Sequence, residues 1–290
     1  SLEPVMDRYA ARFPKNETIK SSDVIAKLGH ISVQFIEASR LMRTLKRDEL
    51  HGSDKIMTHT VKIYADELHQ RLESTMAEYG KMTQELDQTF PFRLLEKLES
   101  DTNPLLKEHI ESLQNKRKEL REVGLLPTID SVSLDANSID SLETRHAAVM
   151  SLYVKDSEAK LKVLEPLNQK IKLLLNIINS KFQGKELRID EKNGLMIIGK
   201  DGKEIDLTLL SSGEQHELVM FYDLMFKVEP NTLIMIDEPE LSLHITWQNK
   251  FIDELKQIVE LSNFDVLIAT HSPTIVGDNS HLMVGLGNNE

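Results

Sequence analysis

The chain of 290 residues contains no cysteine, which excludes disulfide bonds, thiolate zinc sites and cysteine nucleophiles. A protein without cysteine is compatible with the reducing cytosol, so we expect a cytoplasmic location. No stretch reaches the ~20 consecutive apolar residues of a membrane-spanning helix, and we expect no membrane partner. Aromatic residues make up only 5% of the chain while methionine occurs 11 times, which favours long helices over an all-β core.

The charge balance is acidic, with a formal net charge of −12 at pH 7. This excess argues against a protein that coats nucleic acid over its whole surface, although a local basic strip could still contact DNA. Neither candidate strip has interleaved aromatic residues for base stacking, so a solvated helix face is the favoured interpretation. The strips consist of Arg40, Arg43, Lys46 and Arg47, and of Lys116, Arg117, Lys118 and Arg121.

The first part of the chain has apolar residues at three- and four-residue spacing, which predicts long amphipathic helices. One helix is expected over about residues 21–47, a second ends before Phe90, and a third covers about residues 93–121. A longer helical stretch spans residues 139–182, where Pro166 should kink or split it. These helices are expected to pack antiparallel on one another or on a partner.

After Gly184 the pattern changes to short apolar runs separated by turn residues. Leu187–Ile189 and Leu195–Ile198 flank an Asn-Gly pair, which predicts a β-hairpin. A second turn at Lys200–Lys203 returns the chain toward a serine- and glycine-containing stretch.

That stretch, Ser211-Ser212-Gly213, opens an apolar-periodic helix. Small hydroxyl and glycine residues at a helix start leave backbone N–H groups exposed at the positive end of the helix dipole, which suits an anion such as phosphate. Taken alone, the same residues are also an ordinary N-capped helix.

Two further apolar runs each end in groups that can act on phosphate. Thr232–Ile236 predicts a strand that is buried on both faces of a parallel sheet. It ends at Asp237 and Glu238, two carboxylates that need a cation or a proton to offset their desolvation. In nucleoside triphosphatases the first such acid holds Mg²⁺ and the second orients the attacking water. A second buried strand is expected over Asp265–Ala269, and it leads to His271, which could reach a terminal phosphate. Solvated acids and a structural histidine are the alternative.

The order of these three features resembles the C-terminal half of an ABC-type ATPase head. Residues 210–215 are similar to its signature motif, residues 232–238 to its Walker B motif with the catalytic glutamate, and His271 to its switch histidine. The segment Glu240–His244 falls at the D-loop, and its sequence ELSLH is more similar to the OLD-type and phage-defence ATPases than to the transporters.

The resemblance implies an α/β fold: a partial P-loop NTPase lobe over residues 183–290, preceded by a large all-α helical insertion over residues 1–182. Heads of the SMC and DNA-repair kind carry such helices before the signature motif. The resemblance also implies ATP and Mg²⁺ as cofactors and a homodimer in which two heads enclose the nucleotides. The implied site residues are Glu238 and His271 for catalysis, Asp237 for the metal, and Ser211, Ser212, Gly213, Glu214 and Gln215 for the nucleotide.

An ATPase of this kind also needs a Walker A loop, G-x-x-x-x-G-K-[ST], to hold the phosphates. Gly194–Lys200 spells its first seven positions, but Asp201 follows where a hydroxyl should bind Mg²⁺, and the four intervening residues read as a strand. We therefore expect the chain to be the C-terminal portion of a longer ATPase and to be inactive by itself. The alternative is a partner to a separate chain that carries the Walker A loop.

Two other functions stay open at this point. The chain could be a non-catalytic interaction or scaffold module whose helices bind an effector protein. It could also be a DNA-repair or chromosome-maintenance head that grips duplex DNA, although the acidic charge argues against it.

Overall fold

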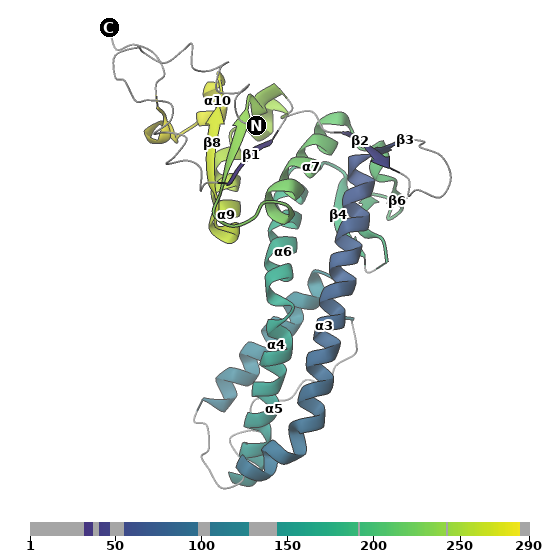
Figure 1. Ribbon diagram of the computed structural model, residues 1–290, viewed down its shortest axis with the longest axis vertical. Helices are drawn as coiled ribbons and strands as arrows, with labels where there is room; N and C mark the ends of the chain where they lie inside the picture. Colours follow the sequence, from purple (N-terminus) through teal and green to yellow (C-terminus); the bar gives the residue numbers. More distant parts are fainter. Residues whose placement is uncertain are drawn as a thin grey trace. The chain divides into compact units, whose positions relative to one another are not determined.

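The computed structural model describes residues 32–36, 41–46, 55–97, 105–127, 144–190, 192–241 and 243–284 (Figure 1). The chain forms two compact units, which we call the sheet unit (residues 1–37 and 228–290) and the helical unit (residues 38–227). This division does not follow the expected boundary between residues 182 and 183, because the N-terminal strand joins the C-terminal part of the chain.

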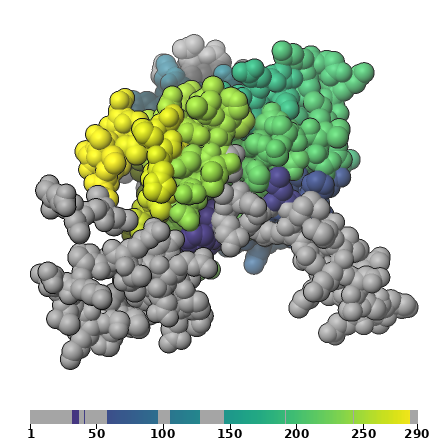
Figure 2. Space-filling view, turned by 90° about the horizontal axis from the view of Figure 1, so that it is seen from above, coloured from purple at the N-terminus to yellow at the C-terminus, as the bar shows by residue number. Residues whose placement is uncertain are grey.

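The sheet unit is built on three parallel strands in the order β1-β7-β8. They are β1 (Ser32–Ile36), β7 (Thr232–Asp237) and β8 (Asp265–Ala269). Ile36 lies opposite Ile236, and Asp237 lies opposite Ala269. In Figure 2 the purple β1 lies against the yellow-green part of this unit, far from it in sequence. The predicted strands β7 and β8 and their parallel arrangement are confirmed. Their predicted burial is wrong, because β7 buries only every second residue and β8 has no buried residue.

Helices follow β7 and β8 in the described part of the sheet unit. They are η3 (Pro239–Leu241), α8 (Ile245–Gln248), α9 (Phe251–Ser262), α10 (Pro273–Val276) and η4 (Ser280–Leu282). The helix α9 buries one stripe at helical spacing, formed by Phe251, Leu255 and Ile258. Every second residue of β7 is also buried, as expected of a strand with one face in the core.

The helical unit is dominated by α3 (Thr60–Lys97), whose 38 residues extend about 57 Å at 1.5 Å per residue. The helix α5 (Thr144–Lys162) packs along α3, and α4 (Leu106–Glu122) packs on α5 (Figure 1). They are followed by α6 (Glu165–Asn179) and α7 (Ser212–Phe226). None of the helices in the part of the chain that the structure describes combines the length and the apolar character needed to cross a bilayer.

An ion pair joins the C-terminal end of α3 to α5. The two terminal nitrogens of Arg93 donate to the Asp156 carboxylate, one of them at 2.7 Å. The expected helix end before Phe90 is wrong, because α3 continues through Pro91 to Lys97. Proline removes the backbone donor that would bond to the Asp87 carbonyl, and the helix continues in spite of this loss. Arg93 Nη2 donates to the Leu86 carbonyl at 2.7 Å.

The break expected at Pro166 is confirmed, since α5 ends at Lys162 and α6 begins at Glu165 with the proline in its first turn. The helix expected over about residues 21–47 is wrong where it is described: β1 lies there together with β2 (Met42–Lys46), which pairs antiparallel with β3 (Lys55–His59). The apolar positions of this region fit both the periodicity of a helix and that of a strand. The pairing of β1 with the remote β7 favours the strand. Three strands thus interrupt the part expected to be all-helical.

The predicted hairpin is confirmed as β4 (Lys185–Asp190) and β5 (Gly194–Gly199), with β6 (Glu204–Ile205) as the return strand. Gly194 begins β5 with a φ of 68°, a conformation that favours glycine. It also lies against α3, where a Cβ atom would be 2.0 Å from the Ala65 carbonyl oxygen. The stretch that resembles a phosphate-binding loop in letters is therefore a strand packed on a helix.

Candidate nucleotide site

Two predicted catalytic residues meet at the carboxyl edge of the parallel sheet. Because β7 and β8 are parallel neighbours, the residues that follow them emerge at the same edge. The Glu238 amide donates to the Ala269 carbonyl at 2.8 Å, and His271 Nε2 lies 3.9 Å from Glu238 Oε1. The side chains of His271 and Glu238 are 91% and 42% exposed, so both are accessible to a ligand.

The backbone of Glu238 is unusual, with a φ of 46°. A non-glycine residue in the left-handed region costs about 1–2 kcal/mol, and such residues concentrate at functional sites. Here the conformation turns the chain sharply from β7 into η3, and Leu241 N closes the turn by donating to the Glu238 carbonyl at 3.1 Å. The turn places the carboxylate outside the last strand pair, beside the histidine.

Asp237 is the last residue of β7 and is half-buried at the same edge. Among the described residues no group of three or more His, Asp or Glu side chains could hold a metal ion. Mg²⁺ in nucleotide sites takes one or two protein carboxylates and completes its shell with phosphate oxygens and water. Asp237 therefore fits an ion that is bound together with nucleotide phosphates.

Two residues outside the predicted site also hold this edge: Glu240, in the segment that resembles a D-loop, and Gln248 of α8. The Glu240 carboxylate of η3 accepts hydrogen bonds from Thr270 Oγ1 and from the His271 amide. Gln248 of α8 accepts a hydrogen bond from Ser272 Oγ at 3.0 Å. The sequence feature that could have indicated Glu240 is its carboxylate, two positions after Glu238. His244, in the same segment, lies with its Nδ1 2.8 Å from Thr246 Oγ1 at the start of α8.

The signature-like residues form the start of α7. Ser211 is the N-cap: its hydroxyl accepts from the Glu214 amide, and Glu214 Oε2 accepts from the Ser211 amide at 2.8 Å. Ser211 and Ser212 are exposed, whereas Glu214 and Gln215 are buried. Gln215 donates to the carbonyl of Leu210 at 2.8 Å. Glu214 and Gln215 therefore brace the loop from inside, and the serines lie at the surface.

Glu214 is also ion-paired, because Lys185 Nζ of β4 lies 2.8 Å from its Oε2 atom. Burial raises the pKa of the Glu214 carboxyl, but the hydrogen bonds from Lys185 and Ser211 outweigh burial, and the net shift is downward. The carboxylate is thus held in its charged form at the helix start, where it fixes the loop geometry.

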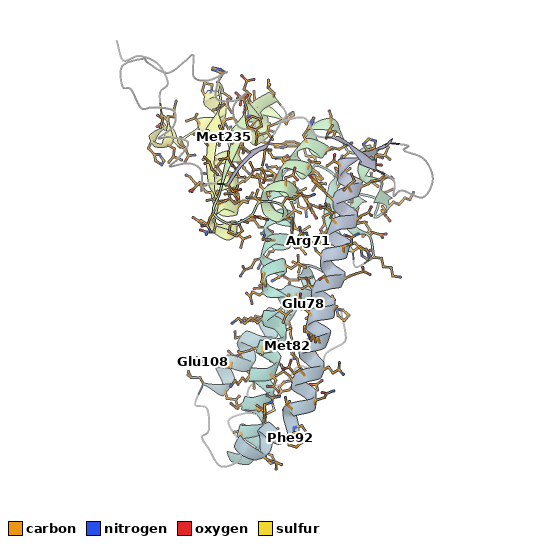
Figure 3. All side chains as sticks on the ribbon, in the orientation of Figure 1. Arg71, Glu78, Met82, Phe92, Glu108 and Met235 are labelled. Atoms are coloured by element: carbon orange, nitrogen blue, oxygen red, sulfur yellow. The ribbon has the colours of Figure 1, made fainter. Side chains whose placement is uncertain are left out.

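The rest of α7 is buried in the helical unit. Its Glu217 pairs with Lys181, and its Asp223 accepts from the Tyr64 hydroxyl of α3. At its C-terminal end the Phe226 carbonyl accepts from Arg71, which Figure 3 labels on α3, at 2.9 Å. The structure thus places Ser211–Gln215 in the helical unit and Asp237, Glu238 and His271 in the sheet unit.

Two acids at the end of β7 and a histidine after β8 thus lie at one edge of a parallel sheet. Residues 30–276 match a family model described as AAA ATPase domain, and the chain belongs to that family. A structural match is the Smc head domain with an extended coiled coil bound to the C-terminal domain of ScpA, from Pyrococcus furiosus. It has 18% sequence identity and a TM-score of 0.29, and the match covers 73% of this chain and 50% of that chain. No curated protein matches the chain.

Proposed function

We propose that the chain is part of an ATP-hydrolysing head of the ABC type, in which the sheet unit supplies the groups that cleave the γ-phosphate. The observation that carries the proposal is the meeting of Glu238 and His271 at 3.9 Å beyond the ends of two adjacent parallel strands. The accessible side chains and the left-handed backbone of Glu238 support the same assignment.

The proposed roles follow from the chemistry of each group. Glu238 orients a water molecule whose oxygen forms a bond to the γ-phosphorus as the bond to the β–γ bridging oxygen breaks, giving ADP and phosphate. Asp237 would hold Mg²⁺, which neutralises charge on the phosphates when it is bound. His271 donates a hydrogen bond to the γ-phosphate and stabilises its developing charge.

The N-terminus of α7 is proposed to act on a nucleotide held by a second head. Ser211, Ser212 and Gly213 present a hydroxyl-rich helix start that suits the γ-phosphate. Hydrolysis would then require a homodimer, and an effector protein or DNA would sense its closed state. We also propose that the ATPase is of the OLD-like, phage-defence kind, on the basis of the ELSLH segment. The chain by itself is proposed to be inactive because it has no Walker A loop.

The test is the substitution Glu238→Gln in the full-length protein, assayed for Mg-ATP binding and for phosphate release. We expect ATP affinity to change less than about threefold and turnover to fall at least about 100-fold, because only the orientation of the water is lost. Glu229→Gln, at an exposed position of the same unit, is the matched control and should behave as wild type. Unchanged turnover in Glu238→Gln would remove Glu238 from its role.

A second measurement addresses the Walker A expectation. Isothermal titration of Mg-ATP into the 290-residue chain should show no binding, since β5 leaves no phosphate loop at Gly194–Lys200. Micromolar, Mg-dependent binding would contradict this expectation.

A further inference from the structure

The loop that carries His271 is held by one carboxylate. Thr270 Oγ1 lies 2.8 Å from both carboxylate oxygens of Glu240, and the His271 amide donates to Glu240 Oε1 at 2.9 Å. The Ser272 amide in turn donates to Thr270 Oγ1 at 3.0 Å. A single side chain from η3 thereby fixes three consecutive residues after β8.

A second contact joins the same two segments. Gln248, which is buried, accepts from Ser272 Oγ at 3.0 Å through Oε1. Its Nε2 atom donates to the carbonyls of Glu240 and Leu243 at 3.4 and 3.3 Å. The amide of Gln248 therefore ties the D-loop segment to the end of the histidine loop.

The imidazole of His271 is not held by packing, since its side chain is 91% exposed. Its position is set by the backbone that carries it, and that backbone hydrogen-bonds to Glu240 at the His271 amide itself. Glu240 also lies inside the turn closed by the hydrogen bond from Leu241 N to the Glu238 carbonyl. The acid proposed to orient water and the anchor of the histidine thus belong to one turn.

We infer that Glu240 is a positioning residue that holds His271 at the distance and direction it needs to reach the γ-phosphate. This inference rests on the proposed function. A carboxylate suits the task because it accepts from a hydroxyl and a backbone N–H together, and hydrogen bonds to an ionised acceptor are about twice as strong as neutral ones. A movement of the D-loop segment would move Glu238 and His271 together.

The experiment compares Glu240→Ala, Glu240→Gln and the control Glu260→Ala, at an exposed position of α9, in the full-length protein. Glutamine can accept from the His271 amide and donate to Thr270 Oγ1, so it keeps the contact, whereas alanine removes it. We expect the alanine variant to lower kcat on the order of 10- to 100-fold with KM changed less than about threefold, because a misplaced group loses rate and not ground-state binding. The glutamine variant should recover most of kcat.

Hydrogen exchange supplies a readout that does not depend on hydrolysis. The amide of His271 should exchange at least about tenfold faster in Glu240→Ala than in wild type, and close to the wild-type rate in Glu240→Gln and Glu260→Ala. Unchanged exchange in Glu240→Ala would overturn the inference. So would faster exchange with an unchanged kcat, since the contact would then be structural only. A wild-type protein without ATPase activity overturns the proposed function, and the exchange result then decides by itself whether Glu240 positions the loop.

Discussion

The ion pair between Lys181 and Glu217 gives the sharpest test of how α7 is anchored. Its side chains are 3% and 0% exposed, and Lys181 Nζ also lies 4.6 Å from the centre of the Phe221 ring. Removing one member of a buried pair leaves a charge in a poorly solvated environment and costs about 3–5 kcal/mol, whereas an apolar replacement of both members is close to neutral. Each charge of this pair therefore stabilises the fold only while its partner is present.

We expect Lys181→Met and Glu217→Leu each to lower the free energy of unfolding by about 3–5 kcal/mol, and the double variant to fall within about 1 kcal/mol of wild type. The double-mutant cycle then gives a coupling of at least about 5 kcal/mol. Urea unfolding followed by far-UV circular dichroism measures these values, because helices dominate this unit.

An exposed pair in the same unit is the control. Lys118 and Glu122 of α4 are 3.9 Å apart with side chains 76% and 63% exposed, and Glu122→Leu should change stability by less than about 1 kcal/mol. The reasoning is refuted if Lys181→Met and Glu217→Leu each cost less than about 1 kcal/mol, or if their costs simply add in the double variant.

Three further predictions concern the loops around β5 and α7. Gly194→Ala should lower the free energy of unfolding in urea by about 3 kcal/mol. Gly202 also has a positive φ, but nothing lies within 4 Å of an added Cβ, so Gly202→Ala should cost only about 1 kcal/mol. Equal costs would contradict the packing argument. Asp206 accepts from Thr208 and Lys62, which lower its pKa from 3.8 to about 2, so its contribution to stability is present above pH 4 and is lost as the pH falls toward 2. Asp206→Asn should flatten thermal stability against pH in that window, and an unchanged slope would count against it. Ser211→Ala removes the N-cap of α7 and should lower unfolding stability by about 1 kcal/mol, with no loss if the cap contributes nothing.

Local sequence patterns predicted the elements whose causes are local. The small residues Ser211-Ser212-Gly213 predicted the start of α7, and Pro166 predicted the break before α6. The strands β7 and β8 followed from apolar runs bounded by polar residues. From their parallel pairing the approach of Glu238 to His271 could also be expected.

Features that depend on remote contacts were not predictable in the same way. β1 is a strand because it pairs with β7, and a helical spacing of apolar residues in its neighbourhood misled the local interpretation. α3 continues through Pro91, and just beyond the proline Arg93 pairs with Asp156 on another helix, a contact that local rules cannot anticipate. The contact of Glu240 with Thr270 joins two loops 30 residues apart, which no spacing rule reveals.

The β5 segment also bears on how phosphate loops are designed and searched for. A pattern scan would find a complete Walker A string in this chain after the single exchange Asp201→Ser. The string would still lie in an antiparallel ladder, with Gly199 N donating to the Lys203 carbonyl at 2.8 Å and Gly194 pressed on the backbone of α3. Its amides are committed to neighbouring strands and cannot turn toward an anion. A phosphate site thus depends on the direction of the backbone amides. Completing the Walker A sequence by substitution alone would give a pattern match without a phosphate-binding loop.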